Sequence, residues 1–272
     1  MALIKSISGI RGTIGGMPGD NLSPVDVVKF AAAYGMWLKN DRSKDRPTVI
    51  LGRDARISGK MVSSLVSNAL VGLGMDVIDL GLSTTPTVEM AVILEEADGG
   101  IIITASHNPK QWNALKLLNF KGEFLNATNG EQVLKIAEND GFVFAEVMAL
   151  GSYRKKKNMI NKHINEVISL DLVNVEAIRK AEFKIVVDGV NSTGGIAIPQ
   201  LLDKLGVECI ELYCDPTGDF PHNPEPLEEH LGDISKRVVE ENAHAGIVVD
   251  PDVDRLAIVC EDGSMLGEEY TL

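Results

Sequence analysis

The sequence has few cysteines, no long apolar run and no excess of basic residues, and each of these absences excludes a class of protein. Cys209, Cys214 and Cys260 are odd in number and form no CxxC pair, so we expect reduced thiols and a cytoplasmic protein. No apolar run is long enough to span a membrane, and the N-terminal MALIKSISGIRG lacks the core of a signal peptide. The net charge of −13 argues against binding to nucleic acid or to an anionic membrane.

The chain's 272 residues are enough for one large or two ordinary domains, and 44% of them are hydrophobic, as is typical of globular proteins. In the first half, short apolar runs alternate with segments whose apolar residues recur at helical spacing. Predicted strands lie at Thr48–Leu51, Asp76–Leu80 and 101–106, and predicted helices begin at Ser23–Pro24, near Met61 and at Thr85–Pro86. This alternation predicts a parallel sheet with right-handed crossovers.

The second half repeats this plan after Gly151–Lys157, which we interpret as a linker because it interrupts the pattern. Its three consecutive lysines could contact a phosphate, but a solvated linker is the favoured interpretation. Predicted helices lie at Met159–Leu170, Gly195–Leu205 and Leu227–Asn242, and predicted strands at Phe183–Val187, Val207–Tyr213 and Gly246–Val249. We therefore predict two related α/β modules, one in residues 1–155 and one in residues 156–272.

The first candidate site is the polar loop that follows the apolar strand Ile101–Ile103. It places Ser106 at the carboxyl end of a buried strand, where open α/β sheets bind their ligands. A serine becomes a nucleophile or a phosphoryl carrier only beside a base or a cation, and His107, Lys110 and Lys116 are the local candidates. On this stretch alone, an incidental serine in a polar loop is an equal alternative.

The second candidate site follows the last predicted strand and reads DPDVDR. Asp250, Asp252 and Asp254 alternate, so in an extended segment their carboxylates point to one side and require a cation, by preference Mg²⁺ together with a phosphate. A calcium loop is excluded because Arg255 occupies the position that requires glycine. A solvated acidic turn is the less favoured alternative, and a nucleophilic first aspartate, as in aspartate-dependent phosphatases, remains open.

Together these segments resemble the α-D-phosphohexomutase family of phosphoglucomutases, phosphomannomutases and phosphoglucosamine mutases. The matching motifs are Ser8–Gly12, Gly52–Asp54, Thr104–Pro109 with Asn113 and Lys116, and Asp250–Arg255. The resemblance implies two similar three-layer α/β modules with mostly parallel mixed sheets, forming the N-terminal half of a four-domain enzyme. The last eight residues would then begin a third domain.

The resemblance also implies a role for each site residue. Ser106 would carry the phosphoryl group as phosphoserine, and its oxygen would bind Mg²⁺ together with Asp250, Asp252 and Asp254. Charge stabilisation and proton transfer would fall to Arg255, Lys116 and His107, and Arg11 would face the active site. Structural alternatives remain open for three of them: a solvated strand lysine at Lys116, a loop brace at His107 and a salt-bridge partner at Arg11.

The implied activity is reversible phosphoryl transfer between O1 and O6 of a hexose or hexosamine phosphate through a hexose 1,6-bisphosphate. The sequence has no GEMSG-like sugar-reading loop and no C-terminal phosphate-binding loop, so we expect the fragment alone to be inactive. The alternatives are an aspartate-nucleophile phosphatase and a non-catalytic module that binds Mg²⁺ or a sugar phosphate. The identity of the sugar and the oligomeric state are not predicted.

Overall fold

The computed structural model describes residues 3–6 and 9–266, so Ser8 of the first motif and residues 267–272, in the predicted start of a third domain, lie outside the described part. Residue contacts divide the chain into two compact units. The first unit comprises Met1–Arg53, Ser58–Ala105 and Gln111–Lys157, and the second comprises Asp54–Ile57, Ser106–Lys110 and Asn158–Leu272. Two short segments from the first half of the sequence therefore belong to the second unit, and one of them carries Ser106.

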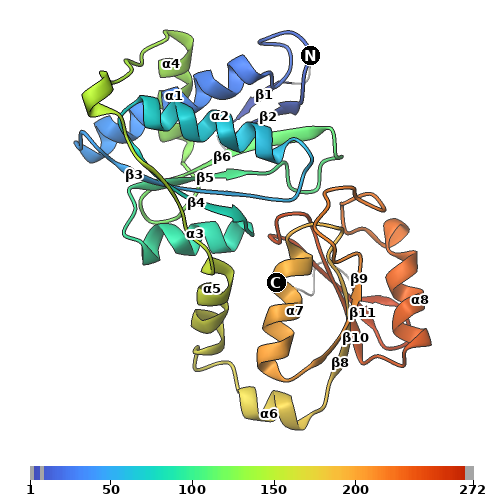
Figure 1. Ribbon diagram of the computed structural model, residues 1–272. Helices are drawn as coiled ribbons and strands as arrows, with labels where there is room; N and C mark the ends of the chain where they lie inside the picture. The colour runs from blue at the N-terminus through green and yellow to red at the C-terminus, as the bar shows by residue number, and fades with distance from the viewer. Residues whose placement is uncertain (1–2, 7–8, 267–272) are drawn as a thin grey trace. The chain divides into compact units, whose positions relative to one another are not determined.

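The first unit is built on a mixed sheet with the strand order β1-β2-β6-β5-β3-β4-β7 (Figure 1). Its strands are β1 (Ile4–Ser6), β2 (Gly9–Thr13), β3 (Thr48–Arg53), β4 (Asp76–Leu82), β5 (Gly99–Ile103), β6 (Trp112–Leu118) and β7 (Tyr153–Lys155). Strands β5, β3, β4 and β7 are joined in parallel, whereas β1, β2, β6 and β5 are joined antiparallel. The β5 strand, which precedes the serine loop, is buried along its whole length because both faces of the sheet are covered.

Helices cover both faces of this sheet. They are α1 (Pro24–Arg42), α2 (Gly59–Gly72), α3 (Thr85–Leu94) and α4 (Ala127–Glu138), followed by the 3-10 turn η1 (Val147–Ala149). Helix α1 begins at a capping box in which Ser23 and Asp26 satisfy each other's backbone N–H groups, and α3 begins at Thr84 followed by proline at the second helical position. Apolar residues of α1, α2 and α4 form one core with the sheet, and α3 packs on the opposite face.

The second unit repeats the three layers on the sheet β12-β11-β10-β8-β9. Its strands are β8 (Lys184–Asp188), β9 (Glu208–Leu212), β10 (Ala245–Val249), β11 (Leu256–Cys260) and β12 (Met265–Leu266). Its helices are α5 (Met159–Ile168), α6 (Val175–Lys180), α7 (Gly194–Leu205) and α8 (Gly232–Glu240), with the 3-10 turn η2 (Glu228–His230). Helix α8 packs in the core on one face of the sheet, and α7 packs on the other.

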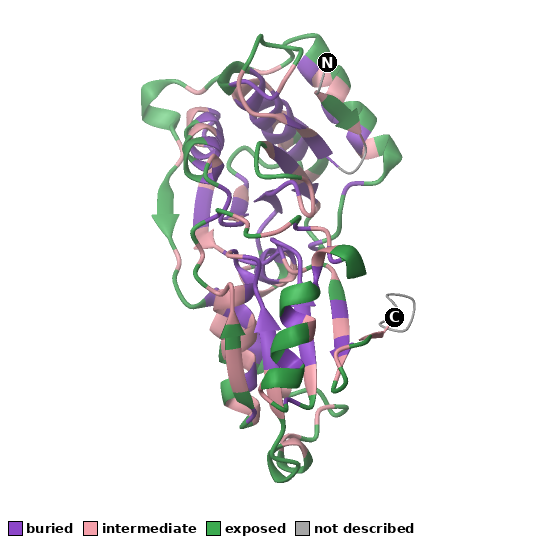
Figure 2. Ribbon diagram, turned by 90° about the vertical axis from the view of Figure 1, so that its right-hand side faces the viewer, coloured by how far each residue is buried: buried purple, intermediate pink, exposed green. Residues whose placement is uncertain are grey.

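The two sheets confirm the predicted pair of mixed α/β modules, although parallel pairs do not outnumber antiparallel ones as expected. In each sheet half of the strand pairs are parallel and half antiparallel, because β6 and β11 return as antiparallel neighbours of β5 and β10. Figure 2 shows buried residues concentrated in the central strands and exposed residues along the outer turns of the helices. None of the helices within the described ranges combines the length and apolar character needed to cross a bilayer.

The interpretation of Gly151–Lys157 as a linker was wrong for its central residues. Tyr153–Lys155 form β7, which adds a parallel edge strand beside β4. Two side-chain contacts hold the strand there: the Tyr153 hydroxyl donates to Asp79 at 2.6 Å, and the Ser152 hydroxyl donates to Asp76 at 2.6 Å. A three-residue edge strand with exposed side chains has no apolar periodicity, so its sequence resembles a loop.

Candidate functional site

Ser106 follows β5 by three residues and adopts a backbone conformation that side chains rarely occupy. Its φ of +49° lies in the left-handed region, which costs a non-glycine residue about 1–3 kcal/mol unless surrounding contacts enforce it. Proline at position 109 prevents the loop from continuing a ladder of hydrogen bonds. The conformation of this loop therefore has to be imposed by contacts from elsewhere in the second unit.

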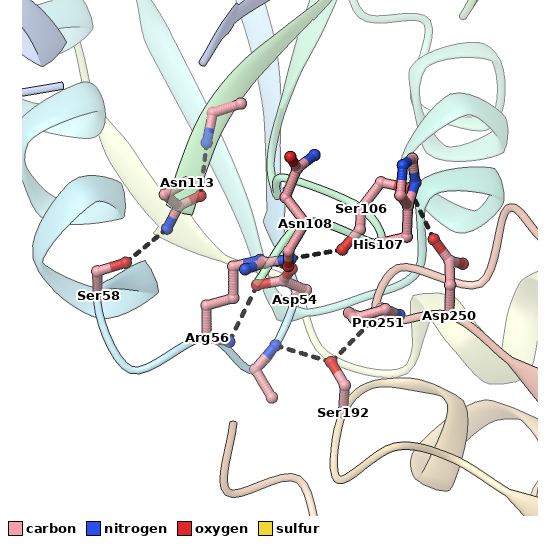
Figure 3. Close-up of polar contacts among 12 residues, drawn as sticks. Asp54, Arg56, Ser58, Ser106, His107, Asn108, Asn113, Ser192, Asp250 and Pro251 are labelled. Carbon is pink, nitrogen blue, oxygen red and sulfur yellow. Dashed lines mark hydrogen bonds and ion pairs between the residues drawn. The ribbon is translucent and has the colours of Figure 1, made fainter. Parts of the chain in front are cut away.

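Arg56 supplies those contacts from a fully buried position (Figure 3). Its guanidinium donates to the backbone carbonyls of Ser106, of Asn108 at 2.6 Å and of Pro109 at 2.7 Å. Its Nε donates to Asp54 at 2.9 Å, so the buried positive charge has a buried carboxylate beside it. One guanidinium thus holds three carbonyls of a single loop. It can do so because its five N–H donors lie in one plane in a fixed geometry.

Ser192 connects the Arg56 segment to the aspartate loop. Its hydroxyl oxygen accepts from the backbone N–H of Ala55 at 3.2 Å, and its proton is donated to the carbonyl of Pro251 at 2.7 Å. The hydroxyl of Thr193 donates to the same carbonyl at 2.8 Å. The serine loop and the aspartate loop are therefore held by one connected set of buried hydrogen bonds.

The aspartate loop begins directly after β10 and gathers three carboxylates. Asp250 and Asp252 are fully buried and Asp254 is exposed, and one oxygen from each lies within 4.8 Å of the others. The backbone N–H groups of Asp254 and Arg255 donate to Oδ1 of Asp250 at 3.1 and 3.2 Å, which orients that carboxylate. Burial and the charges of Asp252 and Asp254 raise the pKa of Asp250 well above its usual range.

This set of donors fits a hard divalent cation. Three carboxylates within a few ångströms repel one another, and two of them are shielded from water, so a positive charge among them offsets a large electrostatic cost. Oxygen-only ligands are the ones that magnesium, calcium and manganese prefer. The described residues are therefore compatible with a metal ion at this position.

Ser106 lies at the edge of this cluster. Its hydroxyl donates to Oδ2 of Asp250 at 2.7 Å, and Oδ1 of Asp254 lies 3.4 Å from the same oxygen. Nδ1 of His107 lies 3.3 Å from it. The second unit thus brings together five predicted site residues, Ser106, His107 and the three aspartates, so that a group attached to the Ser106 oxygen would lie beside the three carboxylates.

Glu225 links two further predicted residues and was itself not predicted. Its Oε1 lies 4.0 Å from Nε2 of His107 and 3.7 Å from Nη1 of Arg255. Burial and the positive charge of Arg255 lower the pKa of His107 below its ordinary value, in spite of the nearby carboxylates. Lys110, a candidate partner of Ser106, instead forms a surface ion pair of 2.9 Å with Asp219.

The two other predicted residues, Arg11 and Lys116, lie in the first unit. Arg11 is on β2 opposite Ala114 of β6, and its buried Nε has no hydrogen-bond acceptor within the described ranges. Lys116 is on β6, with its ammonium 5.7 Å from the ring centroid of Phe124. Their predicted place beside Ser106 stays a prediction.

Comparison with known proteins gives the same family for both units. The family description "Phosphoglucomutase/phosphomannomutase, alpha/beta/alpha domain I" matches residues 3–144, and the corresponding domain II description matches residues 161–263. A protein named "Phosphoglucomutase/phosphomannomutase" from Thermococcus kodakarensis is 35% identical over 263 residues, 96% of this chain and 57% of that protein. A "Probable phosphoglucosamine mutase" from Methanosphaera stadtmanae is 32% identical over 96% of this chain and 57% of its own length.

A solved structure has a similar fold. The crystal structure of a phosphoglucomutase/phosphomannomutase family protein from Burkholderia thailandensis superposes with a TM-score of 0.77 at 27% sequence identity. The match covers 96% of this chain and 56% of that protein. The chain thus spans a little over half the length of the relatives that it matches.

Proposed function

Because this chain belongs to the phosphoglucomutase/phosphomannomutase family, we propose that it carries the phosphoryl-transfer centre of a phosphohexomutase. Such an isomerase moves a phosphoryl group between O1 and O6 of a hexose phosphate or hexosamine phosphate. The observation that carries the proposal is the 2.7 Å hydrogen bond from the hydroxyl of Ser106 to Asp250, at the edge of the acidic cluster.

Ser106 is the proposed phosphoryl carrier. As phosphoserine it transfers its phosphoryl group to the free hydroxyl of the sugar phosphate: the P–Oγ bond breaks and a P–O bond to the sugar forms. The sugar hydroxyl loses its proton to a base, and Oγ of Ser106 takes up a proton to become the free hydroxyl. The product is a hexose bisphosphate. Reversal at the other end of the sugar returns the other phosphoryl group to Ser106, so one serine serves both positions.

Asp250, Asp252 and Asp254 are the proposed ligands of Mg²⁺, with an oxygen of phosphoserine completing the set. When bound, the ion would stabilise negative charge on the transferring phosphoryl group. Magnesium is proposed over calcium because magnesium sites in proteins commonly combine carboxylates with the phosphate of a substrate. Burial of two of the aspartates keeps water from competing for their oxygens.

The positive and titratable residues receive distinct proposed roles. Arg255 orients and neutralises phosphate oxygens, and Glu225 at 3.7 Å holds its guanidinium in place. His107 and Lys116 are the candidates for proton transfer and charge stabilisation, and Arg11 is a candidate contact to the substrate. Arg56 is a positioning residue, because it acts on the backbone of the serine loop.

The experiment that tests the proposal is transfer of phosphate to the chain from a hexose bisphosphate. The chain is incubated with glucose 1,6-bisphosphate or mannose 1,6-bisphosphate and Mg²⁺, and its peptides are mapped by mass spectrometry. Complete isomerisation is not expected of this chain alone, but transfer of one phosphoryl group needs only the serine and the acidic cluster. We therefore expect phosphate on Ser106 in the wild-type chain and none at that peptide in Ser106→Ala. Phosphate on Asp250 that hydroxylamine removes, with Ser106 unmodified, would instead support an aspartate nucleophile.

A further inference from the structure

A pocket of about 310 Å³ lies in the first unit, where α2 passes the carboxyl ends of β3, β4 and β7. Five cationic side chains line it: Arg53, Lys60, Lys155, Lys156 and Lys157. This concentration of positive charge stands out in a chain whose net charge is −13. The pocket contains the lysine run that the sequence analysis interpreted as part of a solvated linker, and none of its lining residues belongs to the serine or aspartate loop.

Three of these lysines form no ion pair with the described part of the chain. Within residues 3–6 and 9–266, no carboxylate lies within 4.0 Å of the ammonium groups of Lys60, Lys155 or Lys157. Lys156 is different, because it pairs with Glu95. Ammonium groups that share one concave surface repel one another, and an anion that enters the pocket relieves this repulsion.

The one carboxylate that lines the pocket, Asp79, already accepts hydrogen bonds from other parts of the first unit. Asp79 is buried, and it accepts hydrogen bonds from the Tyr153 hydroxyl at 2.6 Å and from the Gly81 N–H at 2.8 Å. Burial and this contact raise the pKa of Tyr153 to about 12, so the phenol keeps its proton and continues to donate. Asp79 thus fixes β7 beside α2, and one carboxylate in the lining is outnumbered by five cationic side chains.

Recognition in this pocket rests on the ammonium groups. The hydroxyls of Ser64 and Ser67 on the same face of α2 donate to backbone carbonyls of their own helix, at 3.0 and 3.1 Å. Lysine is a strongly hydrated point charge that suits phosphate oxygens without demanding one fixed geometry. The volume also exceeds what one phosphate group needs, which leaves room for an organic substituent.

We propose that this pocket binds the phosphate group of a small phosphorylated metabolite, with Lys60, Lys155 and Lys157 as its principal contacts. The carboxyl ends of parallel strands are where open α/β sheets bind their ligands, and β3, β4 and β7 all end here. The site consists of first-unit residues and does not depend on the function proposed for Ser106. Its occupant can be free phosphate or a phosphate monoester, since both present the same dianion.

The test is a titration of the full chain, labelled with ¹⁵N, in low-salt buffer that contains EDTA and no divalent cation. Inorganic phosphate is one probe and phenyl phosphate is the other, which separates a free-phosphate site from an ester site. We expect saturable shifts of the backbone amides of Ser63, Ser64, Gly81 and Lys155, and weaker binding as ionic strength rises. Tighter binding of phenyl phosphate would identify an ester as the ligand, and equal binding would identify phosphate itself.

The variant Lys155→Gln/Lys157→Gln removes two of the contacts from exposed positions and is expected to raise the dissociation constant at least tenfold. The control Lys121→Gln/Lys180→Gln makes the same change in net charge at exposed lysines outside the pocket and should leave the constant within twofold. The proposal is overturned if neither probe shifts these amides. It is also overturned if both double variants weaken binding equally, because net charge would then explain the effect.

Discussion

The hydroxyl of Ser106 donates a 2.7 Å hydrogen bond to the carboxylate of Asp250, although 144 residues separate them in the sequence. Both belong to the second unit, because the short segment Ser106–Lys110 packs with it. The contact places a potential phosphoryl carrier beside three carboxylates. Phosphoryl transfer depends mainly on the positioning of the reacting groups and on compensation of their negative charge. The hydrogen bond positions the Ser106 hydroxyl, and the carboxylates beside it could hold a cation that compensates the charge.

Removal of one carboxylate should change stability in opposite directions with and without metal. In EDTA, Asp252→Asn relieves repulsion in a buried acidic cluster, so we expect its melting temperature to equal or exceed that of the wild type. In millimolar Mg²⁺ the wild type should gain several degrees and the variant little, because ligand binding stabilises only a protein that binds it. Calorimetry measures both values.

The control for this experiment is Asp262→Asn, which removes one charge at an exposed position outside the cluster. It should respond to Mg²⁺ as the wild type does. An equal response of Asp252→Asn and the wild type to Mg²⁺ would show that the cluster does not hold the ion.

Replacement of Arg56 by methionine should release the serine loop. The change removes donors to three loop carbonyls and leaves Asp54 buried without its partner charge, which we expect to cost about 3–5 kcal/mol in the free energy of unfolding. Hydrogen exchange of residues 106–110 should accelerate more than exchange in the core strands β8 and β10. Uniform acceleration throughout the second unit would indicate a purely global loss of stability.

The double variant Asp54→Asn/Arg56→Met separates the two effects of that substitution. It should recover part of the stability, since no unpaired charge remains buried, but the loop should still exchange quickly because its carbonyl contacts are absent. Recovery of slow exchange in the loop would contradict a positioning role for Arg56.

Gly218 should tolerate no side chain, because it packs closely against the segment that carries Arg56. Its φ is +75°, and an added Cβ would lie 1.9 Å from the carbonyl oxygen of Ala55. We expect Gly218→Ala to cost at least about 1–3 kcal/mol in the free energy of unfolding, measured by urea denaturation. Gly232→Ala is the matched control: its Cβ would meet nothing within 4 Å, so stability should hold or rise slightly. Equal costs at the two glycines would argue against the close packing.

His222 should make the second unit more stable in mild acid. Burial lowers the pKa of His222, but its 3.0 Å hydrogen bond to the buried Asp188 and the charge of that carboxylate outweigh the burial and leave the pKa raised. The pair therefore contributes its full stabilisation below pH 6.5, which is the ordinary pKa of a histidine. This stabilisation is lost as the pH rises through the higher pKa of His222 in the folded state. We expect His222→Gln to cost about 1.5–3 kcal/mol at pH 5.5 and less at pH 8.5, measured by urea denaturation.

His230→Gln provides a comparison at a histidine whose ion-pair partner, Glu229, is exposed. Its cost should be under about 1 kcal/mol at both pH values, as for other surface ion pairs. A cost of His222→Gln that does not change with pH would show that the contact with Asp188 is not an ion pair.

Strand ends and residue patterns were enough to predict the centre of the candidate site. Ser106 and Asp250 each follow a buried apolar run, and the carboxyl end of such a strand is where an open α/β sheet binds its ligands. The helix start at Ser23–Pro24 was predicted from a capping side chain followed by proline, and the same pattern predicted a start at Thr85–Pro86, although the capping residue of α3 is Thr84, one position earlier.

Residues that act through the backbone could not be predicted in this way. Arg56 donates to carbonyls 50 or more positions away. Every residue has a backbone carbonyl, so the residue types in the serine loop do not indicate which carbonyls accept a hydrogen bond from an arginine. Ser192 also contacts backbone groups far away in the sequence, whereas Glu225 contacts the side chains of His107 and Arg255. The motif Gly52–Asp54 was the available signal for Arg56, because the arginine follows it by two residues.

The most direct test of the account asks whether the phosphoryl group and the metal share one centre. The chain phosphorylated at Ser106 is titrated with Mn²⁺, a paramagnetic substitute for Mg²⁺, and the ³¹P resonance of phosphoserine is recorded beside that of phosphorylated Asp252→Asn. We predict that stoichiometric Mn²⁺ broadens the wild-type resonance beyond detection and leaves that of the variant sharp. A wild-type resonance that stays sharp while Mn²⁺ is bound would contradict the account.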